Sequence, residues 1–332
     1  MTNKPSKKHY IEWLALKTII AYIRSGTITA TQTKVKRLVP VLQKILKSEF
    51  RWANRNLQMI YGNSLSEKQR QVLVKIVFEN VLFSHVEGMQ VGDIKFQEIG
   101  TEHIHDALKL DRGVIACSIH LGSWEPGLKR FAELVAPTPA AIVYRHANNP
   151  LSEAEFIKIR APYGVEWIRR DQPRDILKAI KEKKVLGLMT DINTREGGVT
   201  APFLGIPAQC PPGPARLALG LGAPIVPIYA VRDTPGEARL FALPAIEPQK
   251  KRGASEEDVA ALTTEINTTF APVIHNYAEQ YNWLHARWRA RSSGELWRAD
   301  TTLEVMNNAK VDPSLPPPHL GERVFTLINE RL

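Results

Sequence analysis

The sequence has 332 residues, 44% hydrophobic and 23% charged, with 44 Lys and Arg against 34 Asp and Glu and a net charge of +10. This length allows a large core, and the composition excludes a disordered chain. The positive charge favours an anionic membrane surface or an acidic carrier protein, and the absence of RRM, zinc-finger and KH patterns argues against nucleic acid as a partner.

The first apolar segment runs from Tyr10 to Ile23 and is interrupted by Glu12 and Lys17. These charges argue against a signal peptide and against a membrane-spanning helix. An interfacial helix is favoured, with basic residues toward anionic head groups. Its apolar side would carry Ile11, Leu14, Ile19 and Tyr22. An ordinary amphipathic helix packed on the domain agrees equally well with this pattern.

The remainder of the first hundred residues also has helical periodicity. Ser66 to Gln69 has the spacing of a capping box and opens a helix that should continue to about Glu87. Pro40 lies inside the helical segment Val35 to Phe50, so we expect a kink or two helices there. Residues 1–100 are therefore predicted to form a helical N-terminal layer.

From Gly113 onward, short apolar runs alternate with amphipathic stretches, which predicts an α/β fold: a mixed, mainly parallel central sheet flanked by helices. The expected strands are Gly113 to Ile119, Ala140 to Tyr144, Val165 to Ile168, Val185 to Thr190 and Ile225 to Val231. The expected helices are Leu128 to Val135, Glu153 to Ile159, Arg174 to Lys183 and Pro214 to Leu221. We assign residues 101–292 to this core.

The C-terminal part is expected to add an antiparallel strand over Arg239 to Ile246 and a long helix over Glu256 to Tyr281 that bends at Pro272. Residues 293–332 form a Pro-rich tail in which Val324 to Ile328 can make a short docked helix. Before these elements, Ile192 to Pro212 is predicted to be a long loop, and loops of that length are often functional. We expect one compact domain.

His120 is a candidate general base, because it follows a buried strand at the end where open α/β sheets place reactive groups. Glu125 comes five residues later, after a tight turn at Gly122, and a carboxylate at that distance can fix the imidazole tautomer. The spacing alone does not distinguish this pair from a histidine that caps a turn and a carboxylate that begins a helix. Only Cys117 and Cys210 occur, which favours a reducing, cytoplasmic setting.

Several motifs that follow one another along the chain favour a catalytic role for His120 and Glu125. The segment His120 to Glu125 resembles the H-x-x-x-x-D/E motif of the lysophospholipid acyltransferase superfamily, in its lipid A biosynthesis branch of lauroyl and myristoyl acyltransferases. Segments similar to other motifs of the branch follow at Tyr144 to Pro150, Arg160 with Gly164, Asp191, Ala201 to Gly205 and Trp283 to Trp288, after a leader at Asn54 to Leu57 and Glu87. The chain departs from the branch at His146, where proline is usual, and in the sequence that follows Asp191.

The resemblance implies transfer of a fatty acyl group from an acyl-carrier-protein or coenzyme A thioester to a lipid hydroxyl, most simply that of a lipid A precursor or a related glycolipid. In this scheme His120 is the general base and Glu125 orients it, with no metal and no cofactor beyond the thioester co-substrate. The enzyme would work at the cytoplasmic face of the inner membrane as a peripheral or interfacially anchored protein. Acyl-chain length, donor and acceptor identity are not determined by these motifs.

Ten further residues are expected to contact substrate: Gly122, Ser123, Tyr144, Arg145, Asn149, Arg160, Asp191, Phe203, Gly205 and Arg287. Arg160 or a backbone amide of the Gly122–Ser123 turn is the candidate donor to the oxyanion. Arg145 and Arg160 can hold phosphates, although a salt bridge to a carboxylate is nearly as good an interpretation of each. Asp191 should face the same cleft, and bracing Arg160 or a loop is its alternative role. Phe203 can line an acyl-chain groove or simply cover the core.

Two other functions agree with the same residues. The His–Glu pair can activate water on a thioester or lipid ester, which would make the protein a hydrolase; neither Ser118 nor Ser123 lies in a G-x-S-x-G elbow, so a serine hydrolase is disfavoured. The second alternative is a non-catalytic protein that binds anionic membranes and retains the remnants of a site.

Overall fold

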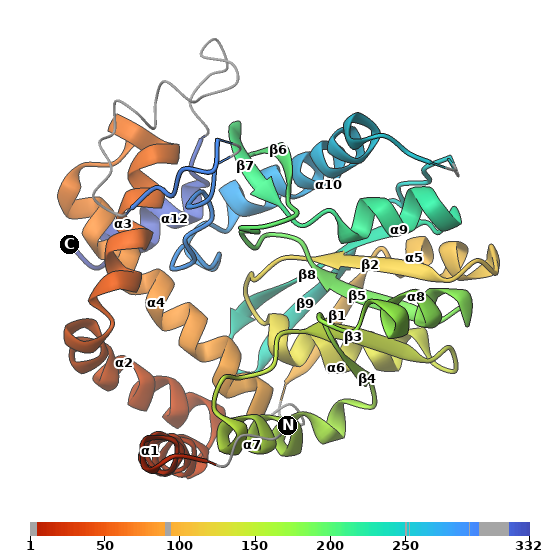
Figure 1. Cartoon of the computed structure of the whole chain (residues 1–332). Coiled ribbons are helices and arrows are strands. Elements are labelled where there is room, and N and C mark those ends of the chain that lie inside the picture. The colour runs from red at the N-terminus through yellow and green to blue at the C-terminus, as the bar shows by residue number, and fades with distance from the viewer. Residues whose placement is uncertain (1–4, 90–93, 250, 252, 292, 299–318) are drawn as a thin grey trace.

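Seven strands of the described chain form one sheet with the order β1-β9-β8-β2-β5-β3-β4 (Figure 1). The computed structural model describes residues 5–89, 94–249, 251, 253–291, 293–298 and 319–332. The strands are β1 (Lys95–Ile99), β2 (Val114–Ser118), β3 (Ala140–Tyr144), β4 (Glu166–Arg169), β5 (Val185–Met189), β8 (Ile225–Thr234) and β9 (Glu237–Ala242). Neighbouring strands pair in parallel except β8 with β9. The expected mixed, mainly parallel α/β sheet is therefore confirmed.

Helices lie on both faces of this sheet and form a layer of their own beside it (Figure 1). They are α1 (Lys7–Arg24), α2 (Ile28–Ile45), α3 (Lys47–Tyr61), α4 (Glu67–Met89), α5 (Thr101–Lys109), α6 (Trp124–Val135), α7 (Pro150–Arg160), α8 (Pro173–Lys181), α9 (Gly213–Leu221), α10 (Glu256–Asn276) and α12 (Glu322–Asn329). Short 3₁₀ turns at Gly62–Ser64 and Ala161–Tyr163 follow α3 and α7.

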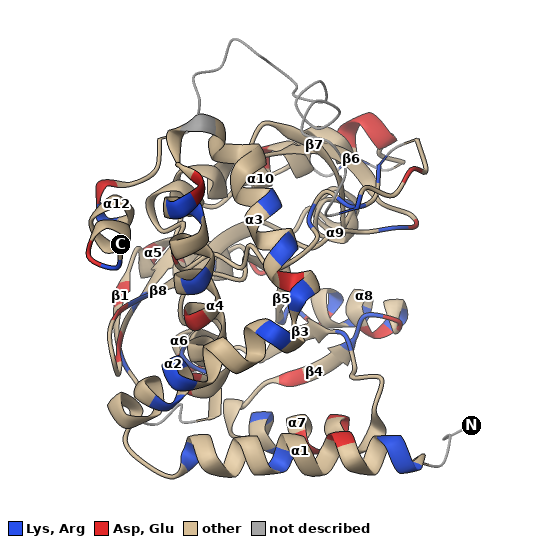
Figure 2. Ribbon diagram, turned by 90° about the vertical axis from the view of Figure 1, so that its left-hand side faces the viewer, with Lys and Arg blue, Asp and Glu red and all other residues tan. Residues whose placement is uncertain are grey.

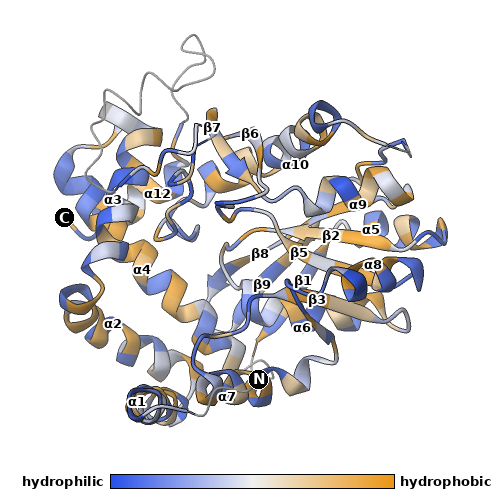
Figure 3. Ribbon diagram, viewed as in Figure 1, coloured by the Kyte–Doolittle hydropathy of each residue, from blue (hydrophilic) through white to orange (hydrophobic). Residues whose placement is uncertain are grey.

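The central strand β2 shows why a continuous apolar run is needed here. Val114 and Ala116 face the core cluster that also contains residues of α5 and α6. Ile115 and Cys117 face the opposite cluster, which contains residues of α9 and α10. Because both faces of a parallel strand are covered, both sets of alternating side chains must be apolar. Figure 3 shows the resulting hydrophobic band along the central strands.

The helical N-terminal layer consists of α1 to α4, and α4 is its central member, since it contacts α1, α2, α3 and α6. Pro40 lies within α2, and the break between helices falls at Leu46, so the expectation of two helices is met six residues after the proline. Strand β1 was not predicted and lies inside the expected helical layer of residues 1–100; its alternating polar sequence places it at an edge of the sheet.

The prediction of a loop from Ile192 to Pro212 was wrong. This segment contains a hairpin of β6 (Val199–Phe203) and β7 (Ile206–Cys210), paired antiparallel and covered by α10. The turn between them is Leu204–Gly205, with φ of +50° and +77°, and two residues with positive φ are typical of the tight turns that join such strands. Burial alternates along Val199–Phe203, as expected of a strand. In the sequence this alternation is hidden, because the segment is mostly apolar.

The C-terminal elements are of the types that the sequence predicts, although their bounds differ. Strand β9 is antiparallel to β8, and α10 contains Pro272 but ends at Asn276. Helix α12 confirms the docked helix, because Val324 and Ile328 are completely buried and Arg331 Nη1 lies 2.8 Å from Glu79 Oε2 of α4. Most of the Pro-rich segment lies outside the described residues.

Helix α1 lies lengthwise beside α7, and basic residues occur along it (Figure 2). It buries Ile20 and Ile23 against the domain. The side chains on its outer surface are Tyr10, Ile11, Leu14, Ile19 and Tyr22, each 44–71% exposed. Within the described ranges, no helix combines the length and the apolar character needed to cross a bilayer.

Candidate active site

His120 and Asp191 meet at the carboxyl edge of the sheet, because they occupy equivalent positions after two neighbouring parallel strands. In the register of β2 with β5, Ser118 pairs with Met189, so both residues lie two positions beyond the paired ends. Asp191 Oδ1 lies 2.8 Å from His120 Nδ1, and Asp191 Oδ2 accepts the His120 backbone N–H at 2.9 Å. One carboxylate thus holds both the backbone and the ring of the histidine.

This contact sets the chemistry of the imidazole. Burial disfavours the charged ring, but the charge and hydrogen bond of Asp191, with a smaller contribution from Glu125, outweigh burial and raise the pKa of His120 above its ordinary value. Burial likewise works against ionisation of Asp191, yet His120 holds the pKa of that carboxyl below its usual range. An ionised carboxylate only accepts, so Nδ1 carries the proton of the neutral ring and Nε2 is left to accept one.

The expected orientation of His120 by Glu125 is corrected by this geometry. Glu125 Oε1 accepts a hydrogen bond of 2.6 Å from Arg160 Nη2 and lies 3.8 Å from His85 Nδ1. Glu125 is 7% exposed; burial opposes its charge, but Arg160 and His85 keep its pKa below the ordinary value. The carboxylate that positions His120 is Asp191, and Glu125 acts on the ring only through its charge. The carboxylate five residues after the histidine was the obvious partner in sequence, whereas the strand neighbour is the partner in space.

Trp124 contacts both histidines of the site. Its indole is edge-on to both imidazoles, with ring centroids 5.6 Å from His120 and 5.4 Å from His85. Trp124 begins α6, and Glu125 follows it in the first turn, where the positive end of the helix favours a carboxylate. His85 and its helical neighbour Ser84, whose Oγ accepts the Glu125 backbone N–H at 3.2 Å, were not singled out from the sequence. The sequence offered one signal for both residues: they lie two or three positions before Glu87, on the helix that is predicted to continue to about that residue.

The turn that carries His120 rests on a buried charged network. Arg232 donates to Glu87 from Nε at 2.5 Å and from Nη2 at 2.7 Å, and Ser123 Oγ donates to Glu87 Oε2 at 2.8 Å. The Gly122 N–H donates to the carbonyl of Gln280 at 3.1 Å, so one of the two amides of the Gly122–Ser123 turn already has a partner, and the Ser123 amide stays a predicted oxyanion donor. The Ser123 side chain is fully buried and faces Glu87, which gives it a role in holding the turn.

The segment Tyr144 to Pro150 forms the entry to α7. Tyr144 donates to Glu153 Oε1 at 2.8 Å, and Asn149 caps α7 by accepting the Leu151 N–H at 3.0 Å. The Asn149 amide also donates to the His9 carbonyl at 2.9 Å, so it attaches α1 to α7. The geometry gives these two residues structural contacts; substrate binding by them stays a prediction.

Three other predicted substrate residues lie in or on the β6–β7 hairpin. Arg287 is 1% exposed, donates to the Gln209 carbonyl at 3.1 Å and stacks 4.4 Å from the Phe203 ring centroid. Phe203 is 1% exposed, and Gly205 forms the hairpin turn. In this conformation Arg287 and Phe203 are buried packing residues, which gives no support to the expectation that they contact substrate or form an acyl groove.

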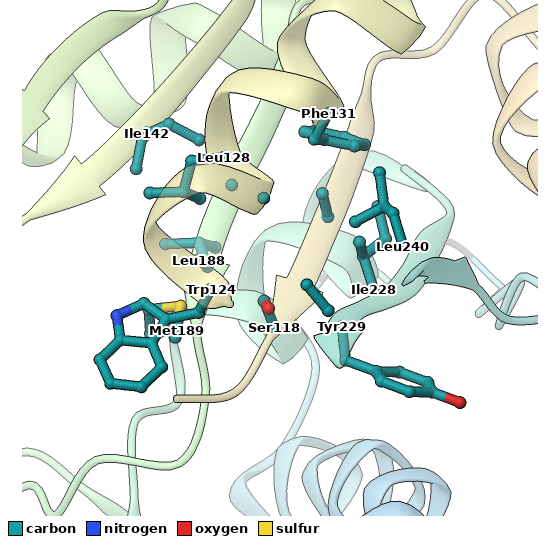
Figure 4. A pocket seen from close by; sticks show the side chains of 14 residues that line it. Ser118, Trp124, Leu128, Phe131, Ile142, Leu188, Met189, Ile228, Tyr229 and Leu240 are labelled. Carbon is teal, nitrogen blue, oxygen red and sulfur yellow. The ribbon is translucent and has the colours of Figure 1, made fainter. Parts of the chain in front are cut away.

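Two apolar cavities lie near the site. A small one of about 50 Å³ is enclosed by α6 and the sheet and reaches Ser118, Met189 and Trp124 beside the His120 turn (Figure 4). The larger one, about 400 Å³, lies between α1, α2, α4 and α7. Its walls include Glu125 and Arg160 together with Arg145, so the predicted pair of arginines does meet at one cavity.

The fold and this geometry define an α/β protein with a carboxylate-held histidine at the carboxyl edge of its sheet, an arrangement typical of enzymes in which histidine handles a proton. Comparison with known families gives the class of reaction. Residues 2–290 match the model of a family described as bacterial lipid A biosynthesis acyltransferase. The chain belongs to this family, and it is an acyltransferase.

Curated relatives agree with the family at modest identity. The chain is 26% identical over 263 residues to a lipid A biosynthesis lauroyltransferase of Escherichia coli (strain K12), an alignment that covers 76% of this chain and 82% of the relative. It is 26% identical over 272 residues to a lipid A biosynthesis palmitoleoyltransferase of the same organism, covering 78% and 85%. A phosphatidylinositol mannoside acyltransferase of Mycolicibacterium smegmatis is 24% identical over 202 residues, covering 59% and 64%.

Proposed function

We propose that the protein transfers a fatty acyl group from an acyl-carrier-protein or coenzyme A thioester to a hydroxyl of a lipid A precursor or a related glycolipid. The observation that carries the proposal is the His120–Asp191 pair, which holds Nδ1 protonated and leaves Nε2 as a base at the open edge of the sheet. Relatives named for lipid A and for phosphatidylinositol mannoside support a glycolipid acceptor.

The reaction follows from this arrangement. Nε2 of His120 removes the proton of the acceptor hydroxyl as its oxygen attacks the thioester carbonyl carbon, and the charge of Asp191 stabilises the imidazolium that forms. The tetrahedral oxyanion then collapses, the carbon–sulfur bond breaks, and the thiolate leaves with the proton held by His120. The products are an ester and a free thiol, and the acceptor hydroxyl serves as the nucleophile.

Glu125, Arg160 and α6 provide the charges that act on the oxyanion and on the imidazolium. The positive end of α6 and the Arg160 guanidinium, 24% exposed, are the groups we assign to oxyanion stabilisation, and Glu125 fixes Arg160. Glu125 also favours the imidazolium of His120 through its charge. Glu125 thus remains a catalytic candidate, with a role different from hydrogen bonding to the histidine.

We further propose peripheral association with the cytoplasmic face of the inner membrane through the outer face of α1. Ile11 and Leu14 are 71% and 61% exposed, and Lys7, Lys8 and Lys17 accompany them on the same helix. Apolar side chains with flanking lysines suit a helix that lies in the interface of an anionic bilayer.

The test supplies labelled lauroyl-acyl carrier protein or lauroyl-coenzyme A with a lipid A precursor, a phosphatidylinositol mannoside or no acceptor. Ester formation that requires an acceptor and disappears in His120→Ala supports the proposal. Release of free fatty acid at the same rate with or without an acceptor would identify a hydrolase. No reaction with any donor, while vesicle binding persists, would favour the non-catalytic membrane-binding alternative.

A further inference from the structure

Tyr281 lies beside the turn that carries His120. It belongs to the segment of residues 277–291, which follows α10, and it pairs with Leu121 in an antiparallel bridge. The next residue, Asn282, donates its backbone N–H to the His120 carbonyl at 2.9 Å. Backbone hydrogen bonds of this kind fix two stretches of chain relative to each other, so the Tyr281 side chain leaves the backbone at a set place next to the catalytic turn.

The Tyr281 hydroxyl interacts with the second member of the catalytic pair. Burial raises the pKa of Tyr281 well above its ordinary value, and the charge of Asp191 and a hydrogen bond to it act in the same direction. The side chain is held firmly: Tyr281 is 2% exposed, and its ring is edge-on to Trp283 with centroids 5.0 Å apart. Because an ionised carboxylate only accepts hydrogen bonds, the phenol is the donor.

The segment of residues 277–291 also fastens the chain that follows Asp191. The backbone N–H of Asn193 donates to His285 Nε2 at 3.3 Å, and its side-chain amide donates to the Arg287 carbonyl at 2.9 Å. This one segment therefore holds both pieces of chain that carry the catalytic pair. Tyr281 contacts both pieces, the catalytic turn with its backbone and the carboxylate with its hydroxyl.

We propose that Tyr281 is a positioning residue, which donates a hydrogen bond to Asp191 and holds that carboxylate in place against the His120 ring. The inference rests on the proposed function, in which His120 is the base. Asp191 already accepts from the ring and the backbone N–H of His120. A third donor from a separate segment fixes the carboxylate independently of the histidine. It also takes up part of the negative charge, so Asp191 attracts the imidazolium less strongly than it would alone.

Other charged and titratable groups face the pair from several elements. Glu125 of α6 acts on the catalytic imidazole through its charge, and His85 of α4 faces both of them. Arg287 acts on the Tyr281 hydroxyl. His285 faces the carboxylate, but burial lowers the pKa of His285 to about 4, so its ring is neutral near neutral pH. All of these groups remain in Tyr281→Phe, so a change in the titration of the base reports the lost hydroxyl.

Histidine titration by NMR tests the proposal without turnover. The imidazole ¹⁵N signals of the full-length protein are followed against pH, and the His120 signal is identified by its loss in His120→Ala. Tyr281→Phe should raise the pKa of His120 by about 0.5, because the charge of Asp191 is no longer shared with a phenol. Replacement of Tyr281 by 3-fluorotyrosine, a stronger donor of nearly the same size, should move this pKa in the opposite direction.

Tyr61→Phe is the matched control. Tyr61 is also buried and edge-on to Trp283, with centroids 5.8 Å apart, but its hydroxyl lies 3.1 Å from His275 Nδ1. This substitution removes a buried phenol hydroxyl from the same aromatic cluster and should leave the pKa of His120 unchanged. Circular dichroism checks that both phenylalanine variants fold. If Tyr281→Phe does not fold, the 3-fluorotyrosine protein decides, because it keeps the ring and the hydroxyl.

Turnover gives an independent readout. In Tyr281→Phe, kcat should fall about tenfold, because the carboxylate is less well positioned. The KM values of donor and acceptor should stay the same, since the phenol acts on the base and touches neither substrate. The rising limb of the pH–rate profile should move to higher pH, opposite to the direction expected for loss of the Asp191 charge in Asp191→Asn.

Three results would overturn the positioning role of Tyr281. The first is a His120 pKa that is the same in the unsubstituted, Tyr281→Phe and 3-fluorotyrosine proteins. The second is an equal change in Tyr61→Phe, and the third is a raised KM with unchanged kcat, which would place Tyr281 at a substrate. The expected titrations without acyl transfer from any donor would keep the positioning role and refute the proposed function, so the two proposals can fail separately.

Discussion

Two buried carboxylates flank Trp124, and they differ in what holds them. Asp191 follows a strand and hydrogen-bonds an imidazole, whose protonation changes near neutral pH. Glu125 begins a helix and hydrogen-bonds a guanidinium, which stays charged at every relevant pH. The first pair is suited to moving a proton, and the second is suited to fixed electrostatics and binding.

The difference arises from topology. Parallel strands bring the residues that follow them to one edge of the sheet, so His120 and Asp191 meet although 71 residues separate them. Glu125 is close to His120 along the chain, but the start of α6 turns its side chain toward α4 and α7. Nearness in sequence was therefore a poor guide to the partner of the histidine.

The largest effect is expected from His120→Ala. Removal of the base should lower kcat/KM for ester formation about 10⁴-fold, because the acceptor hydroxyl is a weak nucleophile while it keeps its proton. The ring is 27% exposed, so the fold should persist, and circular dichroism with thermal unfolding checks this. Activity within tenfold of the unsubstituted protein would remove His120 from the mechanism.

Asp191→Asn should have the next largest effect, about 10²- to 10³-fold on kcat/KM, because the neutral amide no longer fixes the tautomer or stabilises the imidazolium. Asp191 raises the pKa of His120, and the base is active only when neutral. The rising limb of the pH–rate profile should therefore lie above pH 6.5 in the unsubstituted enzyme and move to lower pH in Asp191→Asn. A limb that stays in place would contradict the assignment of Asp191 as the partner.

Arg160→Met is expected to act on stability as well as on rate. It leaves Glu125 as a buried charge without its guanidinium, which should cost about 3 kcal/mol of unfolding free energy, measured by urea denaturation. The rate should fall about tenfold, and the pH limb of His120 should keep its place. Glu125→Gln combined with Arg160→Met should recover part of the stability; no recovery would mean that the pair does not share one interaction.

The smallest effect on catalysis is predicted for Leu14→Ser on the outer face of α1. Binding to anionic vesicles, measured by flotation, should weaken about tenfold, since an exposed leucine no longer enters the interface. Turnover of a detergent-dispersed acceptor should be unchanged. Ala21→Ser is the matched control on the same helix, and equal losses in both variants would argue against a specific apolar contact with the bilayer.

The sequence was sufficient for most of the sheet, because strands such as Ala140–Tyr144 are apolar on both faces and are bounded by clear turns. It was not sufficient for the hairpin Val199–Cys210, where proline at positions 202 and 207 and short strands suggest a loop. Strand β1 was hidden for a similar reason: an edge strand needs few apolar side chains and therefore leaves a weak pattern.

For the site, His120, Asp191, Glu125 and Arg160 were all identified, yet their pairing was not. Pairing depends on the strand order, in which β5 inserts between β2 and β3, and no local pattern encodes that order. His85 could not be predicted as a site residue, because a single histidine on a buried helix carries no motif. Arg287 is buried and braces the β6–β7 hairpin through the Gln209 carbonyl and the Phe203 ring, so its predicted contact with substrate has no support in this geometry.

The packing of helix α12 against α4 affects how the chain can fold during its synthesis. The residues of α12 complete the packing around α4, and Arg331 meets Glu79 across 252 positions of sequence. During synthesis, α4 emerges long before α12, so the apolar patch that receives Val324 and Ile328 stays uncovered until residues 320–332 have left the ribosome. A nascent chain stalled before residue 320 should therefore recruit hydrophobic-binding chaperones, and emergence of residues 320–332 should end that recruitment.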